Sequence, residues 1–265
     1  MTVVRPRDAH AVVVGATGGV GAAVVKALVA QRRYSTVWAL GRTMTVPPEA
    51  EEASRAPADS DPECRVRRLR VDVTSESSIE LAATQFGAEL GRSGGYLSLL
   101  FNAAGVLHEG RNMRPERRLA DVDASSVQRS FAVNALGPLL VAKHFATYLP
   151  RRGRSIVANV SARVGSIGDN RLGGWYAYRA AKAAQNMFTR NLAIELRRRA
   201  ADVICVALHP GTVDTRLSLP FQGNLPSGQM RSPDVAAAQL LQVLDALTSA
   251  DNGSFKAWDG ADIDW

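Results

Sequence analysis

The chain has 265 residues and a mass of 28.4 kDa, which fits one large domain, and its 46% hydrophobic residues are enough for a full core. Lys and Arg number 32 against 25 Asp and Glu, an excess that suits a phosphorylated ligand or a polyanionic partner. Because no basic tail, zinc finger or aromatic RNA platform accompanies that charge, a nucleic-acid binder is only a minor interpretation.

The two cysteines, Cys64 and Cys205, lie far apart and have no metal-ligand spacing around them. This pattern predicts a reduced, cytoplasmic protein and argues against a metal site.

The first apolar run, residues 11–25, follows two arginines and superficially resembles a secretory signal. Four glycines between Gly15 and Gly21 disfavour a helix there, and Lys26 interrupts the run before it could cross a bilayer. No other stretch reaches transmembrane length, so we expect a soluble protein with no membrane span.

Short runs rich in Val, Leu and Ile alternate with helix-length patterns, such as 121–149 and 173–199, along the whole chain. Strands buried on both faces and separated by helices predict a doubly wound parallel sheet in an α/β/α arrangement, as one domain over residues 1–265. The predicted strands are 11–14, 36–40, 68–71, 97–101, 155–160 and 203–208. Residues 43–64, rich in Pro, Ala and acidic residues, are predicted to form an irregular surface insertion.

The segment V-V-V-G-A-T-G-G-V-G, residues 12–21, runs from the first predicted strand directly into a helix. Gly15, Gly19 and Gly21 allow a tight turn and close approach of a ligand, while amides at the start of the helix favour a pyrophosphate. Any tight strand-to-helix turn favours glycine, so the glycines alone are weak evidence. Their position after the first strand indicates a dinucleotide site, and this site would include Thr17 and Val20.

The second strand ends in A-L-G-R-T, where Arg42 stands in place of the acidic residue that an NAD-selective site usually carries. A guanidinium can hold a 2′-phosphate through two charge-assisted hydrogen bonds, so we expect NADP (NADPH) in preference to NAD. The alternative is an ordinary solvated arginine at the end of a strand.

In W-Y-A-Y-R-A-A-K, residues 175–182, helical geometry separates two tyrosines. Tyr178 lies four residues before Lys182, about 400° of rotation, whereas Tyr176 lies roughly 120° away from the lysine. A cation near a phenol favours the phenolate, so Tyr178 and Lys182 together could form a tuned proton donor. The alternative is an amphipathic helix with a packed tyrosine and a solvated lysine; Tyr176 and Trp175 are interpreted as walls of a cleft or packing residues.

Set beside the glycine turn, Tyr178-x-x-x-Lys182 makes the chain resemble the classical short-chain dehydrogenase/reductase family, which has a Rossmann fold. Further motifs of the family follow in order: Asp72-Val73, Asn102-Ala103-Ala104-Gly105, Asn134, and Pro210-Gly211 with Val213 and Thr215. The segments around Tyr178, H-P-G-T-V-D-T and F-K-A-W-D-G-A-D-I-D-W are similar to the C-factor and sniffer-type carbonyl reductases.

The resemblance implies hydride transfer between NADP(H) and a small-molecule carbonyl or alcohol substrate. In this scheme Tyr178 protonates the developing alkoxide, and Lys182 lowers the pKa of Tyr178 and binds the nicotinamide ribose. Asn134 anchors a water in the proton relay. Asp72 lies by the adenine, and the remaining motif residues line the cofactor. An oxyanion formed by hydride addition does need a nearby proton donor.

The serine that most members use to steady the substrate oxygen is where this sequence departs from the family. The segment V-S-A-R-V-G leaves Ala162 at the usual spacing from Gly165, with Ser161 one residue earlier. Because neighbouring strand residues face opposite ways, either the strand end is shifted so that Ser161 fills the role, or Ser166 or a backbone donor substitutes. We take Ser161 as the candidate.

Three further expectations concern substrate, assembly and class of function. Residues 212–231, mostly apolar from Arg216 onward, are predicted to form a substrate-side lid that prefers an apolar carbonyl compound, the alternative being an ordinary surface loop. The family resemblance implies a homodimer or homotetramer.

Because fold does not fix function, the alternative to an enzyme is a C-factor-type dinucleotide-binding signalling protein with little turnover.

Overall fold

The computed structural model describes residues 9–44, 64–110, 113–199, 202–224 and 230–265. Within them a seven-stranded, fully parallel sheet has the strand order β3-β2-β1-β4-β5-β6-β9. Its strands are β1 (Ala9–Val14), β2 (Thr36–Gly41), β3 (Arg65–Arg70), β4 (Tyr96–Asn102), β5 (Ser155–Val160), β6 (Val203–His209) and β9 (Ser254–Ala257). Two short strands, β7 (Thr212–Val213) and β8 (Met230–Arg231), pair separately.

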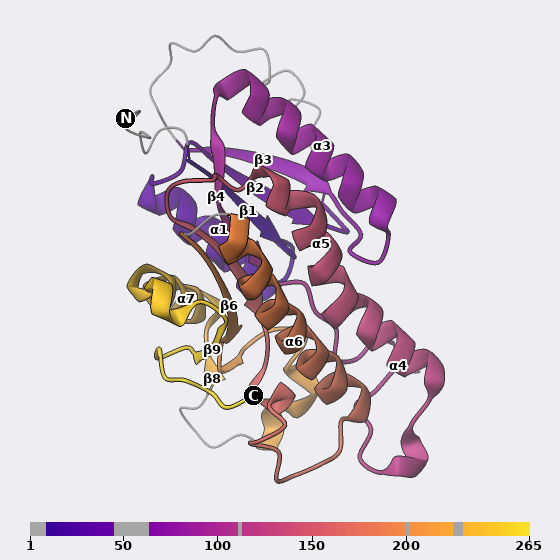
Figure 1. Cartoon of the computed structure of the whole chain (residues 1–265). Helices are drawn as coiled ribbons and strands as arrows, with labels where there is room; N and C mark the ends of the chain where they lie inside the picture. The colour runs from indigo at the N-terminus through magenta and orange to yellow at the C-terminus, as the bar shows by residue number, and fades with distance from the viewer. Residues whose placement is uncertain (1–8, 45–63, 111–112, 200–201, 225–229) are drawn as a thin grey trace.

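Helices cover both faces of this sheet (Figure 1). The α-helices are α1 (Gly19–Gln31), α3 (Glu76–Ser93), α4 (Ala124–Phe131), α5 (Gly137–Phe145), α6 (Tyr176–Arg199) and α7 (Pro233–Ala246). Short helical turns are η3 (Leu119–Asp121), η4 (Ala132–Leu136), η5 (Ala146–Tyr148), η6 (Arg163–Gly165), η7 (Leu219–Asn224) and η8 (Ser249–Asp251). None of the described helices is long and apolar enough to cross a membrane.

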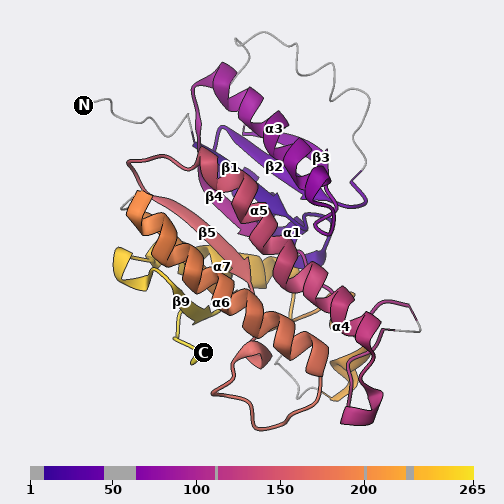
Figure 2. The same cartoon turned by 45° about the vertical axis from the view of Figure 1, so that its right-hand side comes forward.

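Two hydrophobic cores, one on each face of the sheet, hold the layers together. Helices α3, α5 and α6 lie on one face and α1 and α7 on the other, as Figure 2 shows from a second angle. On the first face the fully buried ring of Phe86 makes edge contacts with His10, Trp38 and Tyr148. On the second face Leu28 and Leu240 are both fully buried. The predicted doubly wound three-layer fold is therefore confirmed.

The six predicted strands are present, each within a few residues of its expected bounds. Strand β9 was not predicted, because its S-F-K-A is short and contains a lysine. The predicted helical stretch 121–149 is interrupted, since α4 passes into the π-helical turn η4 before α5 begins. Most of the predicted irregular insertion 43–64 lies outside the described residues, as do positions 225–229 of the predicted substrate-side segment.

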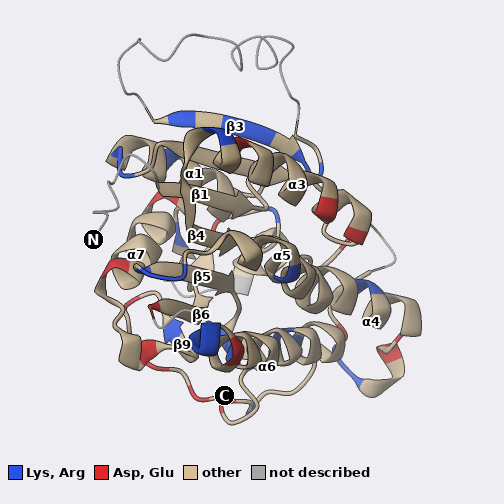
Figure 3. Ribbon diagram, turned by 45° about the horizontal axis from the view of Figure 1, so that its top comes forward, with Lys and Arg blue, Asp and Glu red and all other residues tan. Residues whose placement is uncertain are grey.

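The edge strand β3 carries four arginines, Arg65, Arg67, Arg68 and Arg70, which Figure 3 shows as a blue band at one side of the sheet. Arg67 lies 3.6 Å from a carboxylate oxygen of Glu89 on α3. Charged side chains along an edge strand discourage pairing with another sheet, so this basic cluster has a structural explanation without a nucleic acid.

The strand order reverses between β1 and β4, which are neighbours in space but not in sequence. In open parallel sheets the crevice at such a reversal, outside the carboxyl ends of the strands, is where ligands bind. The predicted site residues lie at or after the carboxyl ends of strands, or on the helices that begin or pass there.

Candidate active site

The turn after β1 is packed so closely that a side chain on any of its three spaced glycines would meet other atoms. Gly15 has a φ of +81°, and a Cβ there would lie 2.6 Å from the Ala104 nitrogen. A Cβ on Gly19 would lie 2.5 Å from the Thr215 methyl carbon, and one on Gly21 would overlap the Gly15 carbonyl. The structure therefore brings the three sequence motifs around Gly15, Ala104 and Thr215 to one place.

Helix α1 begins without a side-chain cap, since Gly18 stands at its N-cap position in an extended conformation. The first amides of a helix have no partner within the helix, and here no side chain replaces one. This leaves a site of positive potential that fits an anion such as the pyrophosphate of a dinucleotide. The chain's own residues, Gly19, Val20 and Gly21, would hold that group.

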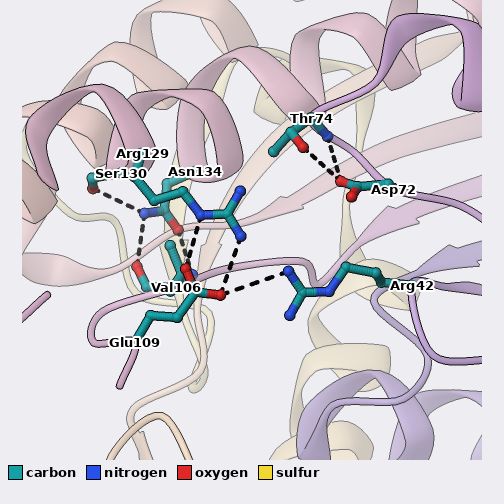
Figure 4. A network of polar contacts seen from close by, with 8 residues as sticks. All are labelled: Arg42, Asp72, Thr74, Val106, Glu109, Arg129, Ser130 and Asn134. Atoms are coloured by element: carbon teal, nitrogen blue, oxygen red, sulfur yellow. Dashed lines mark hydrogen bonds and ion pairs between the residues drawn. The ribbon is translucent and has the colours of Figure 1, made fainter. Parts of the chain in front are cut away.

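Arg42, directly after β2, lies at the adenosine end of the predicted site. A Cβ on the preceding Gly41 would lie 3.0 Å from the Thr17 methyl carbon, so the end of β2 and the glycine turn are in contact. Arg42 Nη1 is 3.6 Å from Glu109 Oε1, an ion pair between half-exposed side chains that Figure 4 shows. A guanidinium at this corner fits a 2′-phosphate.

Asp72 and Asn102 are held by local hydrogen bonds that explain their positions. The Asp72 carboxylate accepts from the Thr74 amide and hydroxyl at 2.9 and 2.7 Å, and these bonds lower the pKa of Asp72. Buried Asn102, at the end of β4, donates to Asn159 on β5 at 2.8 Å. Both residues thus stabilise the loops at the carboxyl edge, beside Val73 and Ala103.

Asn134 lies fully buried in the π-helical turn η4 and holds the loop after β4. Its amide nitrogen donates to the Val106 carbonyl at 2.8 Å, and its amide oxygen accepts from the Val106 nitrogen at 2.9 Å. A third contact joins the amide nitrogen to the Ser130 hydroxyl at 3.1 Å. A π turn inside an α-helix is uncommon and often marks a functional site, and here it orients Asn134 toward the cleft loop.

Gly105 marks the point where the candidate catalytic residues converge. A Cβ placed there would lie 3.2 Å from Asn134 Oδ1, 3.8 Å from a Leu217 methyl carbon and 4.0 Å from Lys182 Nζ. Asn134, Lys182 and the predicted substrate-side segment therefore meet around one small residue.

Tyr178 and Lys182 lie one turn apart near the start of α6, as the spacing predicts. Both are buried, with 8% and 2% of their surfaces exposed. Lys182 Nζ donates to the Val160 carbonyl at 2.8 Å and to Gln185 Oε1 at 2.9 Å, and it lies 5.8 Å from the centre of the Tyr178 ring. The lysine is thus held by the end of β5 and by its own helix, with the tyrosine beside it.

Burial disfavours the charged form of both groups. It raises the pKa of the Tyr178 phenol and lowers the pKa of Lys182 to about 7. The expectation of a Tyr178 pKa below its ordinary value is therefore not met, because desolvation raises it and Lys182 is bound to Val160 and Gln185. The phenol is therefore neutral at pH 7.

Ser161 is buried at the end of β5, with its hydroxyl directed at helix α6. Its Oγ donates to Asn186 Oδ1 at 2.6 Å, and the side chains are each 3% exposed. Asn159, two residues earlier on the same face of β5, likewise donates to Thr189 on α6 at 2.9 Å. Both side chains therefore lie in the packing between β5 and α6. Ser166, also buried, accepts from the Asp169 amide.

An aromatic wall lies over Tyr178. Trp175, with a positive φ of 50°, places its ring 6.3 Å from the Tyr178 ring and 4.9 Å from the Phe221 ring. His108 lies 6.4 Å from Phe221, and its Nε2 donates to the Arg216 carbonyl at 2.9 Å. Tyr176, by contrast, is 42% exposed. The wall links the loop after β4, the start of α6 and the segment after β7.

The motif Pro210-Gly211 follows the end of β6. Val213 pairs with Arg231 between β7 and β8, and Gly211, at a φ of +74°, gives room to the Arg231 guanidinium. That guanidinium stacks on Trp258 with 3.6 Å between its central carbon and the ring centre. The C-terminal segment thereby supports the loop that would face a nicotinamide.

A family model described as short chain dehydrogenase matches residues 9–223. The chain belongs to the short-chain dehydrogenase/reductase family. The resemblance predicted from the motifs is thereby confirmed, and with it membership of a family of oxidoreductases.

Named relatives extend this result. The chain is 35% identical over 195 residues to 1-hydroxy-2-glutathionyl-2-methyl-3-butene dehydrogenase of a Rhodococcus species, covering 74% of this chain and 78% of that one. It is 37% identical over 147 residues to the C-signal protein of Myxococcus xanthus, covering 56% and 83%. The NADPH-bound carbonyl reductase from chicken fatty liver superposes with a TM-score of 0.78 at 28% identity, covering 98% and 99%.

Several residues that shape this family member's site were not singled out from the sequence. Gln185 and Asn186 hold Lys182 and Ser161, and their position one turn after Lys182 on the same helix was the available signal. Glu116 accepts from the Ala177 nitrogen at the start of α6, and Glu109 pairs with Arg42. These last two contacts join segments far apart in sequence, so no spacing predicts them.

The buried Lys182 should make the stability of this family member depend on pH. Its pKa is about 7 in the folded chain and about 10.4 when unfolded, so between these values the unfolded chain binds a proton that the folded chain lacks. Raising the pH from 7 to 9 should therefore stabilise the wild type relative to Lys182→Met by on the order of 2 kcal/mol. Urea unfolding at pH 7, 8 and 9 measures this difference.

The other titrating groups act equally in both proteins and cancel in the comparison. Lys26→Met, at an exposed lysine, serves as the control and should change with pH as the wild type does. A constant difference between wild type and Lys182→Met across the three pH values would contradict a depressed Lys182 pKa.

Proposed function

We propose that this chain is an NADPH-dependent carbonyl reductase or alcohol dehydrogenase. One observation carries the proposal: Tyr178 and Lys182, both buried and one helical turn apart, adjoin the loop where Gly105 and Asn134 meet at the carboxyl edge of the sheet. A proton donor, an amine and an amide around one cleft suit the reduction of a carbonyl group.

Tyr178 is proposed to deliver the proton. A bound NADPH would supply hydride chemistry here, and the proton would be needed at the carbonyl oxygen, where negative charge develops. Because burial keeps the Tyr178 phenol protonated, it can donate to that oxygen. When Lys182 carries its charge, its ammonium favours the phenolate left behind, and so opposes the effect of burial on the Tyr178 pKa.

Lys182 and Asn134 are proposed to return a proton to Tyr178. A lysine with a pKa of about 7 exchanges protons readily at neutral pH, and its Nζ lies near the loop that Asn134 holds. We assign Asn134 the anchoring of a water in this route and Lys182 a further contact to the nicotinamide ribose.

The preference for NADPH rests on Arg42. Its guanidinium lies directly after β2, and no carboxylate stands at the end of that strand to bind the ribose hydroxyls. The similarity to an NADPH-bound carbonyl reductase supports the same cofactor.

The substrate is proposed to be an apolar carbonyl compound. Trp175 lies next to Tyr178 and packs against Phe221, and Leu217 lies by Gly105, so these side chains would offer apolar surface to a substrate. We propose that residues 212–231 act as the substrate-side lid, with Phe221 against Trp175 as its contact to the cleft.

A second candidate function is a dinucleotide-binding signalling protein of the C-factor type with little turnover. Two observations favour it: the similarity to C-signal, and the placement of the Ser161 hydroxyl against Asn186 with Ala162 at the family's serine spacing. The homodimer or homotetramer and the cytoplasmic location stay predictions.

Tyr178→Phe should bind NADPH as the wild type does but lose turnover by about 10²- to 10⁴-fold, because only the transferable proton is removed. NADPH oxidation with a panel of aldehydes, ketones and quinones, alongside NADPH titration, measures both effects. Tyr176→Phe is the matched control and should retain activity. Equal activity of both variants would contradict the proton-donor assignment, and no turnover by the wild type on any substrate would favour the signalling alternative.

Arg42→Ala should weaken NADPH binding by about ten- to a hundredfold and leave NADH binding within about twofold, because it removes the partner of the 2′-phosphate alone. Titration calorimetry with both nucleotides measures the two affinities. Equal losses for NADPH and NADH would contradict the 2′-phosphate assignment.

The predicted role of Ser161 is tested by two substitutions at the end of β5. If the Ser161 hydroxyl steadies the substrate oxygen, Ser161→Ala lowers kcat by about tenfold or more, and Ala162→Ser brings no gain. Steady-state kinetics on the best substrate of the panel decides this. Unchanged kcat in Ser161→Ala together with a gain in Ala162→Ser would show that the hydroxyl belongs at position 162.

A further inference from the structure

Glu109 lies between the predicted 2′-phosphate anchor and the helix that leads to Asn134. Its Oε1 is 3.6 Å from Arg42 Nη1, and the same carboxylate accepts from Arg129 on α4 (Figure 4). Arg129 stands five residues before Asn134 in the chain. The Glu109 carboxylate thus links Arg42, at the end of β2, to helix α4, which leads to Asn134.

The two arginines hold Glu109 unequally. Arg129 makes two hydrogen bonds, Nε to Oε2 at 2.9 Å and Nη2 to Oε1 at 3.2 Å, whereas the contact to Arg42 is a looser ion pair. A paired arrangement of this kind is the strong form of the arginine–carboxylate interaction. The Arg129 hydrogen bond also lowers the pKa of Glu109, so the carboxylate is ionised at neutral pH.

The backbone keeps Glu109 in place. Its amide donates to the Met113 carbonyl at 3.0 Å, and the Met113 amide donates back at 3.3 Å. Three residues earlier, Val106 is held by Asn134 through two hydrogen bonds. The backbone of Glu109 is therefore anchored close to Arg42 and Arg129.

A phosphate arriving at Arg42 would meet this fixed negative charge. A phosphate monoester carries close to two negative charges at pH 7, and like charges a few ångströms apart repel even at a partly exposed site. The 2′-hydroxyl of NADH carries no charge and meets no such repulsion. Glu109 therefore acts on one cofactor and not on the other.

We propose that Glu109 is a specificity-determining residue that competes with the cofactor's 2′-phosphate for Arg42, and that Arg129 limits this competition by holding the same carboxylate. The inference rests on the proposed function, because it takes Arg42 as the anchor of the 2′-phosphate. It goes further in assigning opposite effects to two residues outside every motif of the sequence.

Binding of nucleotides to the ligand-free protein tests this without reference to turnover. Glu109→Gln keeps the size of the side chain and removes its charge. It should bind NADPH and 2′,5′-ADP about three- to tenfold more tightly, with NADH and 5′-ADP unchanged within about twofold. The gain should shrink between about 50 mM and 500 mM salt, since the residues are partly exposed and screening weakens the repulsion. Glu109→Ala should act in the same direction.

Arg129→Gln should have the opposite effect and weaken NADPH and 2′,5′-ADP by about three- to tenfold, because the released carboxylate turns to Arg42. Combined with Glu109→Gln, the same substitution should cost clearly less, which measures the coupling of the two residues. Asp245→Asn is the matched charge control, since Asp245 also pairs with an arginine, Arg33, but Arg33 precedes β2 whereas Arg42 follows it. It should leave all four affinities unchanged.

The outcomes separate this inference from the proposed function. Unchanged or weaker NADPH binding in Glu109→Gln, while Arg42→Ala still loses NADPH selectively, would overturn the competition and leave the cofactor assignment intact. Equal loss of NADPH and NADH in Arg42→Ala would overturn the cofactor assignment itself. A gain in Glu109→Gln that is equal for NADPH and NADH would contradict a specificity role.

Discussion

The burial of one lysine organises the active site. The Lys182 ammonium is held by the Val160 carbonyl at the end of β5 and by Gln185 on its own helix, which ties α6 to the carboxyl edge of the sheet. The cost of removing an ammonium from water appears as a pKa of about 7. Tyr178, one helical turn earlier, lies beside it, so stability is given up at the pair to which the proposed function assigns the proton transfer.

Close backbone packing is the second constraint on the site. Gly15, Gly19 and Gly105 bring the turn after β1, the loop after β4 and the segment after β7 within van der Waals contact of one another. The cleft is therefore assembled from segments that are remote in sequence, and its electrostatics follow from that assembly. Glu109 belongs to the loop after β4, yet it acts on Arg42 at the end of β2. The charge next to Arg42 therefore depends on the segments after β2 and β4 together, not on one sequence motif.

Local patterns were enough to predict the sheet, its doubly wound form and the family. Apolar runs marked the six long strands, the glycine spacing marked the turn before α1, and the interval of four residues placed Tyr178 and Lys182 on one face of α6. Each of these signals is carried by residues within a few positions of each other. Strand β9 and the π turn at Asn134 escaped prediction, because S-F-K-A has no strand pattern and a π turn has no distinct spacing.

The fold and the chemical groups of the site follow from the amino-acid pattern alone, because hydrophobic period, glycine turns and helical spacing are local properties. The environment of those groups arises when the chain folds. Desolvation raises the pKa of Tyr178, Asn186 receives the Ser161 hydroxyl, and Glu109 reaches Arg42. Burial and contacts of this kind depend on which distant segments pack together, and no spacing along one segment encodes that.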